Sequence, residues 1–496
     1  MLRSSIPLAV GLALSAAAAI AASPSALDLP QIGEPADNTL SPIEEKKLGG
    51  RVMSEIYRTG YTLEDPELSN YISRIGWSLV SHSQTPPPPD MTFFVVGDPR
   101  INAFALPGGY IGFNAGLLLA ADNESELAGV MGHELAHVTQ RHIARTAQDT
   151  EVASVATWLA VIAAIIAGSA DPDVVMGALS VGQALNYQRQ VSYTRAHEQE
   201  ADRIGIQTMA AAGFDPHAMA SFFQKIEQKS RLYGSGLPEI LRTHPLSSNR
   251  VAEAQVRADE MPVVVPEPSL EFNLMKARAR VLTADRPSQA VDYYHAQIAA
   301  GHDTPENRYG LALAQSEFGQ SAKALATLQP LLESHPRQPN IELLQGLMLM
   351  QSGKTEQGLG VLQQTIARFP RYAPAILGYA EGLMAAGRPE DARQTLISHE
   401  QALGTQLKTY SLLAQAARES GDLAEASFQM ANFLYRRGDA GNALAHLDAG
   451  LRLPDLSDQD RARLIAMRNE IRGSLPENWR PQTDRSRVAT PVMALQ

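Results

Sequence analysis

The stretch His133-Glu134-Leu135-Ala136-His137 decides how this 496-residue chain can be interpreted. Residues four apart share one face of an α-helix, so His133 and His137 can each direct a ring nitrogen at the same metal ion. Glu134 lies one position further round the helix, where its carboxylate can reach a metal-bound water without becoming a ligand. This spacing is a known signature of zinc metalloproteases.

The residues before the motif support a helix. Ser125 to Gly132 is a helical run that leads directly into His133, with Asn123 or Ser125 available as the N-cap. The alternative is an ordinary surface helix that carries two unrelated histidines. We favour the metal site because both histidines and the glutamate fall at the spacing that the chemistry requires.

A catalytic zinc ion usually has three protein ligands, so a third ligand is expected elsewhere in the chain. Glu198 is a better candidate for this ligand than His142, the histidine that follows the motif. Glu198 and Asp202 are four apart and lie on one helical face, while Glu200 points elsewhere. One carboxylate can bind the metal and the other can hold a ligating imidazole by its free N–H. His142, five residues after His137, is rotated away from the ligand face and is expected to be structural. The alternative for this segment is a solvated acidic helix.

The second half of the chain is repetitive. A glycine recurs at equal intervals, at Gly319, Gly353, Gly387 and Gly421, and a small residue follows five positions after each, at Ala324, Gly358, Ala392 and Ala426. This interval matches the helix–turn–helix period of tetratricopeptide repeats, which stack into a solenoid with a concave face. The alternative is an unrelated helical bundle.

The N-terminus predicts export. Residues 1–26 contain Arg3, an apolar core from Ile6 to Ile20 and then small residues, which together are typical of a cleavable signal peptide. The chain has no cysteine, which excludes thiolate ligands and disulfides and leaves a His/Glu site as the metal cage. The net charge of −11 argues against a nucleic-acid partner.

Residues 152–170 form an uncharged stretch that is long enough to span a bilayer. A single crossing would put His137 and Glu198 on opposite sides of the membrane, so we expect residues 152–185 to form a buried or membrane-skimming hairpin. A peripheral membrane contact through this segment stays open.

Helices are expected over 41–58 and 65–83, and strands over Thr92–Val96 and Ala103–Ile111. The predicted fold class is α+β and mainly α: a zincin-type metalloprotease domain with a small sheet, followed by an α-helical tetratricopeptide-repeat solenoid. We expect a signal peptide over 1–26, the metalloprotease domain over 27–265 and the repeat domain over 266–496, with a proline-rich linker near Pro262–Pro268.

These features together resemble the HtpX/CAAX-prenyl-protease family of zinc peptidases, which also has a segment like Asn102–Ile111 before its His-Glu motif. The export signal and the repeats are similar to those of the soluble periplasmic, BepA-like branch. The resemblance implies that His133, His137 and Glu198 bind one zinc ion and that Glu134 is the general base. Asp202, the other carboxylate of the spaced pair, is then the one expected to hold a ligating imidazole.

The resemblance also implies a role for His244-Pro245. In the BepA-like branch, the histidine of such a segment can occupy the fourth zinc position and shut the enzyme down, and Arg250 would then be an active-site cation. From the sequence alone, a lone loop histidine such as His244 is more often structural, and only the resemblance makes the role of a ligand equally plausible.

Two functions follow as expectations. The first is a periplasmic zinc endopeptidase acting in quality control and assembly of outer-membrane proteins, with misfolded or stalled outer-membrane proteins and their assembly machinery as partners. The second is a chaperone or adaptor that binds through its repeats while His244 keeps the zinc site shut.

Overall fold

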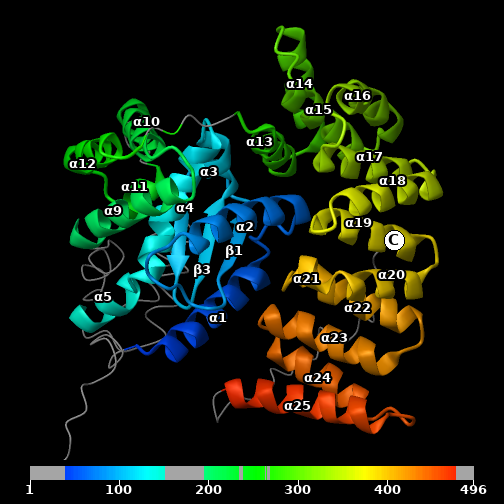
Figure 1. Cartoon of the computed structure of the whole chain (residues 1–496). Helices are drawn as coiled ribbons and strands as arrows, with labels where there is room; N and C mark the ends of the chain where they lie inside the picture. Colours follow the sequence, from blue (N-terminus) through cyan, green and yellow to red (C-terminus); the bar gives the residue numbers. More distant parts are fainter. Residues whose placement is uncertain (1–39, 151–194, 234–237, 263, 265–267, 476–496) are drawn as a thin grey trace, which may run out of the picture.

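A computed structural model describes residues 40–475 except 151–194, 234–237, 263 and 265–267. The predicted signal peptide and the predicted hairpin over 152–185 therefore lie outside the described residues. No helix within the described part of the chain is long and apolar enough to cross a membrane. The predicted fold class is confirmed, since a mainly helical unit with a small sheet is followed by a helical solenoid (Figure 1).

The two predicted N-terminal helices are present and both are capped. Helix α1 (Pro42–Thr59) begins with a capping box in which the Ser41 side chain accepts from the Glu44 amide. Helix α2 (Pro66–Ser81) has Asp65 as its N-cap, and the Asp65 carboxylate accepts from the Leu68 amide. Proline occupies the first helical position in both, where its missing N–H costs no helical hydrogen bond.

The sheet has three strands in the order β1-β3-β2. Strand β1 (Thr92–Val96) pairs in parallel with β3 (Tyr110–Asn114), which pairs antiparallel with β2 (Ala103–Leu106). The single strand predicted over Ala103–Ile111 is wrong, because Pro107-Gly108-Gly109 turns the chain into a hairpin. Gly108 and Gly109 have φ of 75° and 91°, in the left-handed region that glycine adopts at little cost.

Two helices carry the motif residues. Helix α3 (Ala115–Ala120) leads into α4 (Glu124–Thr139), which Asn123 caps and which contains the His-Glu motif. Helix α9 (Arg195–Ala211) contains the predicted third ligand and packs against α4. The two helices meet at Gly132 and Gly205: a Cβ on Gly205 would lie 2.9 Å from the His133 amide nitrogen, so only glycine allows this approach.

Three further helices close the unit over the motif. These are α10 (His217–Tyr233), the short α11 (Glu239–Thr243) and α12 (Ser248–Asp259), and a fourth helix, α5 (His142–Thr150), follows α4 after a break. Helix α10 packs on α4 and helix α12 packs on α9. The loop between α11 and α12 contains His244.

The repeat unit is built from consecutive antiparallel helices. They are α13 (Leu270–Leu282), α14 (Pro287–Ala299), α15 (Pro305–Glu317), α16 (Ser321–Ser334), α17 (Pro339–Gln351), α18 (Thr355–Arg368), α19 (Ala373–Ala385), α20 (Pro389–Ser398), α21 (Glu400–Leu403), α22 (Leu407–Glu419), α23 (Leu423–Arg436), α24 (Ala440–Gly450) and α25 (Asp458–Ser474). The four equally spaced glycines all have positive φ between 72° and 85°, and each follows a helix end. The period therefore marks the turns, as expected.

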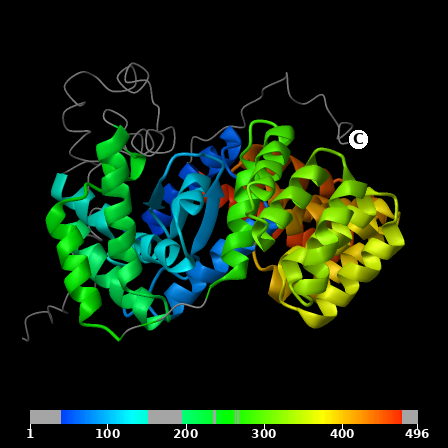
Figure 2. The ribbon, with the colours of Figure 1, turned by 90° about the horizontal axis from the view of Figure 1, so that it is seen from above.

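The solenoid contacts the sheet-containing unit near its start, through its middle, where α19 packs on α2, and near its far end (Figures 1 and 2). Near its start, Arg278 of α13 reaches into the N-terminus of α2, and one hydrophobic core continues from the sheet into the first repeats. Near its far end, Arg437 pairs with Glu64, and Gly438 packs against Ser54 of α1. The repeats thus curve around the end of the unit that α1 and α2 form.

Candidate metal centre

Four buried side chains from three parts of the chain converge beside α4. His133 and His137 come from α4, Glu198 from α9 and His244 from the loop after α11, and one ligand atom of each lies within 4.8 Å of the others. The His133 Nε2 atom is 3.0 Å from His137 Nε2, 3.3 Å from His244 Nδ1 and 3.4 Å from Glu198 Oε2. Glu198 Oε1 is 3.5 Å from His137 Nε2 and 3.0 Å from His244 Nδ1.

These separations fit a tetrahedral metal ion. A tetrahedron with ligand bonds of about 2.0–2.1 Å has edges of about 3.3–3.4 Å. The separations given above, which involve both Glu198 oxygens, lie between 3.0 and 3.5 Å. The donor set of three imidazoles and one carboxylate is one that zinc accepts. His133, His137, Glu198 and His244 are therefore the residues that could hold one metal ion here.

Glu134 faces the cluster without belonging to it. Its side chain is fully buried, and neither carboxylate oxygen has a hydrogen-bond partner among the described residues. The His244 ring approaches it, with Nε2 at 3.3 Å from Glu134 Oε1. A buried carboxylate in this state is costly unless a cation or a bound molecule compensates it, so this residue also fits a metal site.

Asp202 holds His133 from the side opposite the cluster. Its Oδ1 atom is 2.9 Å from His133 Nδ1, so the Nε2 atom of His133 is left to face the cluster. Burial alone would lower the pKa of His133, but the hydrogen bonds to Asp202 and Glu198 outweigh it and raise this pKa to about 10. For His137, burial and the neighbouring His133 charge both lower the pKa well below 6.5.

Arg250 ties the His244 segment to α9. Its Nε and Nη2 atoms donate to the two Asp202 oxygens at 2.7 and 2.8 Å, and its Nη1 atom forms an ion pair with Glu198 at 2.7 Å. The same Nη1 atom donates to the Pro245 carbonyl at 2.9 Å. One guanidinium therefore fixes both carboxylates and the loop next to His244. Arg250, the predicted active-site cation, thus contacts Asp202, Glu198 and the backbone next to His244.

His142 and Glu200 lie on the other side of the cluster. His142 Nδ1 is 2.8 Å from His137 Nδ1, and His142 Nε2 is 3.1 Å from Glu200 Oε2. Burial lowers the pKa of His142, whereas the hydrogen bonds of Glu200 to His142 and Arg145 outweigh burial and lower the pKa of Glu200. The expectation that His142 stays outside the ligand set agrees with this geometry, but its contact with His137 does not follow from the motif.

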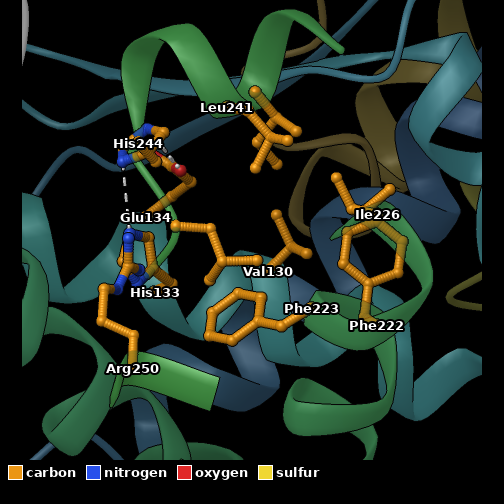
Figure 3. A pocket seen from close by; sticks show the side chains of 11 residues that line it. Val130, His133, Glu134, Phe222, Phe223, Ile226, Leu241, His244 and Arg250 are labelled. Carbon is orange, nitrogen blue, oxygen red and sulfur yellow. Dashed lines mark hydrogen bonds and ion pairs between the residues drawn. The ribbon is translucent and has the colours of Figure 1, made fainter. Parts of the chain in front are cut away.

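An apolar pocket opens beside Glu134 and His133 (Figure 3). Val130, Phe222, Phe223, Ile226 and Leu241 line one side of it, and the polar groups His133, Glu134, His244 and Arg250 lie at the other. The pocket lies between α4, α10 and α11, so a bound segment would bring apolar side chains next to the buried carboxylate.

The structure brings together all seven predicted site residues: His133, Glu134, His137, Glu198, Asp202, His244 and Arg250. Their roles as ligands, base and support stay predictions. The residues that the sequence did not identify are those behind His137, namely His142, Arg145 and Glu200.

Comparison with known proteins agrees with this geometry. Residues 66–258 match the model of peptidase family M48, and residues 349–403 match a tetratricopeptide repeat. The chain is 33% identical to the beta-barrel assembly-enhancing protease of Escherichia coli (strain K12) over 463 residues, which cover 92% of this chain and 94% of the relative.

Two further relatives extend the comparison. A putative beta-barrel assembly-enhancing protease of Vibrio cholerae is 37% identical over 313 residues, 62% of this chain and 64% of that protein. The mitochondrial metalloendopeptidase OMA1 of Arabidopsis thaliana is 33% identical over 172 residues, 34% of this chain and 32% of that protein. The match to OMA1 covers only about a third of each protein, so the similarity to OMA1 concerns only that part of this chain.

A buried His-His-Glu-His group that could hold a metal ion, a repeat solenoid and a nearly full-length match thus agree, and the resemblance drawn from the sequence is confirmed. The chain is a metalloendopeptidase that belongs to peptidase family M48, and within it to the repeat-bearing family of beta-barrel assembly-enhancing proteases.

Proposed function

We propose that this chain is a zinc-dependent endopeptidase of the periplasm that acts in the quality control and assembly of outer-membrane proteins. The observation that carries the proposal is the buried cluster of His133, His137, Glu198 and His244 with Glu134 beside it. Misfolded or stalled outer-membrane proteins, and their assembly machinery, are the proposed partners. The names of the near full-length relatives support this assignment, and the repeats would recruit the clients.

Zinc is the metal that the donor set favours. His133, His137 and Glu198 would hold it, since two imidazoles and a carboxylate at these separations match a catalytic zinc site and the sequence contains no thiolate. When bound, zinc supplies a Lewis acid that polarises the scissile carbonyl and lowers the pKa of a water molecule to about 7.

Glu134 is the general base of the proposed reaction. Its carboxylate is buried next to the ligands and has no hydrogen-bond partner within the described part of the chain, so it can accept a proton from the attacking water. The same oxygen can then deliver that proton to the leaving amine. Asp202 and Arg250 hold His133, Glu198 and the His244 loop in place in this scheme.

His244 is proposed to keep the resting enzyme shut. Its Nδ1 atom lies at the fourth corner of the ligand cluster, and its Nε2 atom faces Glu134. One side chain therefore takes the position that water needs and approaches the base that would activate it. This observation favours the second candidate function, a chaperone or adaptor state in which the repeats bind clients while the site is closed.

Replacing Glu134 by Gln tests the enzyme assignment. We expect the Glu134→Gln protein to keep one zinc per chain and to lose casein hydrolysis by about 100- to 10,000-fold, because only the proton acceptor is removed. Metal content by mass spectrometry and casein cleavage are measured on the same preparations. Cleavage at the wild-type rate would show that Glu134 is not the base, and absence of zinc from the wild type would overturn the metal assignment.

Replacing His244 by Ala separates the two candidate functions. We expect zinc to stay bound and cleavage of casein, or of the protein itself, to increase, because the fourth position becomes available to water. The control is His217→Ala, since His217 contacts Asp215 and Asp259 and not the cluster. Joint loss of zinc and activity in His244→Ala would make His244 an essential ligand, contrary to the proposed resting state.

A further inference from the structure

We propose that His142 and Glu200 are positioning residues for His137: they hold its imidazole through a directed chain of hydrogen bonds, so that its Nε2 lone pair points at the metal. The inference rests on the proposed function, because it takes His137 as a metal ligand. It adds two residues to the site that the sequence motif does not contain.

The first step is the contact between the two rings. His137 Nδ1 and His142 Nδ1 lie 2.8 Å apart, and both rings are buried. Two ring nitrogens at this distance share one hydrogen, so one of them donates and the other accepts. A neutral His137 whose Nε2 binds a metal carries its hydrogen on Nδ1, which makes His137 the donor and His142 the acceptor.

The second step fixes the direction of the chain. Because His142 Nδ1 accepts, the hydrogen of a neutral His142 ring lies on Nε2, and this atom is 3.1 Å from Glu200 Oε2. Glu200 accepts that hydrogen, and Arg145 donates to the same carboxylate oxygen at 2.9 Å. Each group in the series therefore has one defined role, and a single tautomer of His137 satisfies all of them.

The fold sets up this contact at some cost. Helix α4 ends at Thr139, and Arg141 adopts φ of 52°, a left-handed conformation that is unfavourable for a residue with a side chain. The turn brings His142 back against His137, which an uninterrupted helix would not allow at a spacing of five residues. Arg141 is held there by Glu45 at 3.0 Å and by the Leu40 carbonyl at 2.7 Å.

Two further observations indicate that the ring orientation is controlled. The His197 ring stacks on His142 with centroids 4.4 Å apart and an interplanar angle of 13°. On the opposite side of the cluster, Asp202 contacts His133 Nδ1 at 2.9 Å and is itself paired with Arg250. Each histidine of the motif thus has a neighbouring side chain at Nδ1. At His133 it is Asp202 of α9, which is paired with Arg250. At His137 it is His142, which is followed by Glu200 of α9 and Arg145.

The test compares two nearly isosteric replacements of His142. Asn places an oxygen where it can accept from His137, whereas Leu has the same shape and no acceptor. Zinc affinity is measured by chelator competition on the full mature chain carrying Glu134→Gln, so that self-cleavage does not interfere. We expect His142→Leu to weaken zinc binding by about 10- to 100-fold and His142→Asn to recover most of this loss.

Glu200→Gln tests the far end of the hydrogen-bond series from His137 through His142. It also tests the positioning role if the His142 variants do not fold. Its loss of charge is expected to weaken zinc binding several-fold while the thermal unfolding of the metal-free protein stays near that of the parent. His217→Gln is the control, since this histidine is paired with two aspartates outside the cluster.

The outcomes separate the two levels of the argument. If the Glu134→Gln parent binds no zinc, the proposed function is overturned and this inference falls with it. If the parent binds zinc but Leu and Asn at 142 have equal affinities, or Glu200→Gln changes nothing, the positioning role alone is overturned.

Discussion

In the proposed zinc site, the pKa of His133 makes metal binding depend on pH. Without metal, Asp202 and Glu198 raise the pKa of His133 to about 10, whereas the pKa of His137 is lowered by burial. At neutral pH the metal-free site therefore holds a proton on His133 and none on His137. This proton must leave before Nε2 can bind a metal, because the lone pair is the ligand.

Zinc affinity is accordingly expected to rise with pH. Release of about one proton per zinc makes the apparent dissociation constant fall by about tenfold for each pH unit between about 6.5 and 8.5. Chelator competition at several pH values measures the slope, and calorimetry in buffers of different ionisation enthalpy counts the protons. An affinity that is flat across this range would contradict a protonated His133 in the metal-free site.

At the residue scale, most of the site could be predicted and one side of it could not. The His-Glu spacing and the pair Glu198/Asp202 follow from helical geometry, and His244 came only from the family resemblance. The position of His142 against His137 cannot be obtained from a continuous helix. The left-handed Arg141 that interrupts the helix has no sequence signal, since arginine rarely adopts φ of 52°.

At the scale of elements, the site depends on how closely α4 and α9 approach each other. Gly132 and Gly205 form the crossing point, next to His133 on one helix and within two turns of Glu198 on the other. A Cβ on Gly205 would lie 2.9 Å from the His133 amide nitrogen, so a side chain there must push the helices apart.

Gly205→Ala is therefore expected to destabilise the protein by about 1–3 kcal/mol and to weaken zinc binding, because it separates Glu198 from the histidines. Gly360→Ala is the matched control, since a Cβ at Gly360 of α18 meets no atom within 4 Å among the described residues. That control is expected to be neutral or to stabilise by up to about 1 kcal/mol. Chemical denaturation and chelator competition check both variants, and equal effects of the two would refute the crossing argument.

The elements themselves were predicted unevenly. The capped helices after Ser41 and Asp65 and the repeat array have local signals, namely caps, periodicity and turn glycines. The sequence predicts one strand where the structure has a hairpin at Gly108-Gly109, because apolar residues on both sides of the turn resemble one continuous strand. The domain boundary at 265 stays a prediction.

At the scale of the whole molecule, a buried charge cluster joins the repeats to the peptidase unit. Arg278 of α13 donates to both Asp65 oxygens at 2.7 Å and forms an ion pair with Glu67, which also accepts from Asn340 and Tyr372 at 2.9 Å each. Pairing at this interface could not be predicted, because Arg278 and Asp65 lie in different units, far apart in the sequence, and no local pattern links them.

Arg278→Met is expected to destabilise the protein by about 3–5 kcal/mol, because two buried carboxylates lose the cation that they share. Arg58→Met removes an exposed pair with Glu55 and should cost less than about 1 kcal/mol. The midpoint of guanidinium denaturation is compared for the two variants in the Glu134→Gln background. If both variants unfold at the same denaturant concentration, the cluster does not hold the two units together.

The attachment of the solenoid at Arg278 and again at Arg437 has a consequence for its evolution. A repeat array that is tethered once can gain or lose whole repeats freely, because each repeat touches only its neighbours. Here an inserted repeat would rotate and displace the distal anchor from Glu64 and Ser54. Copy number is therefore constrained by the distance between the two anchors, and the concave face can vary only through substitutions within the repeats.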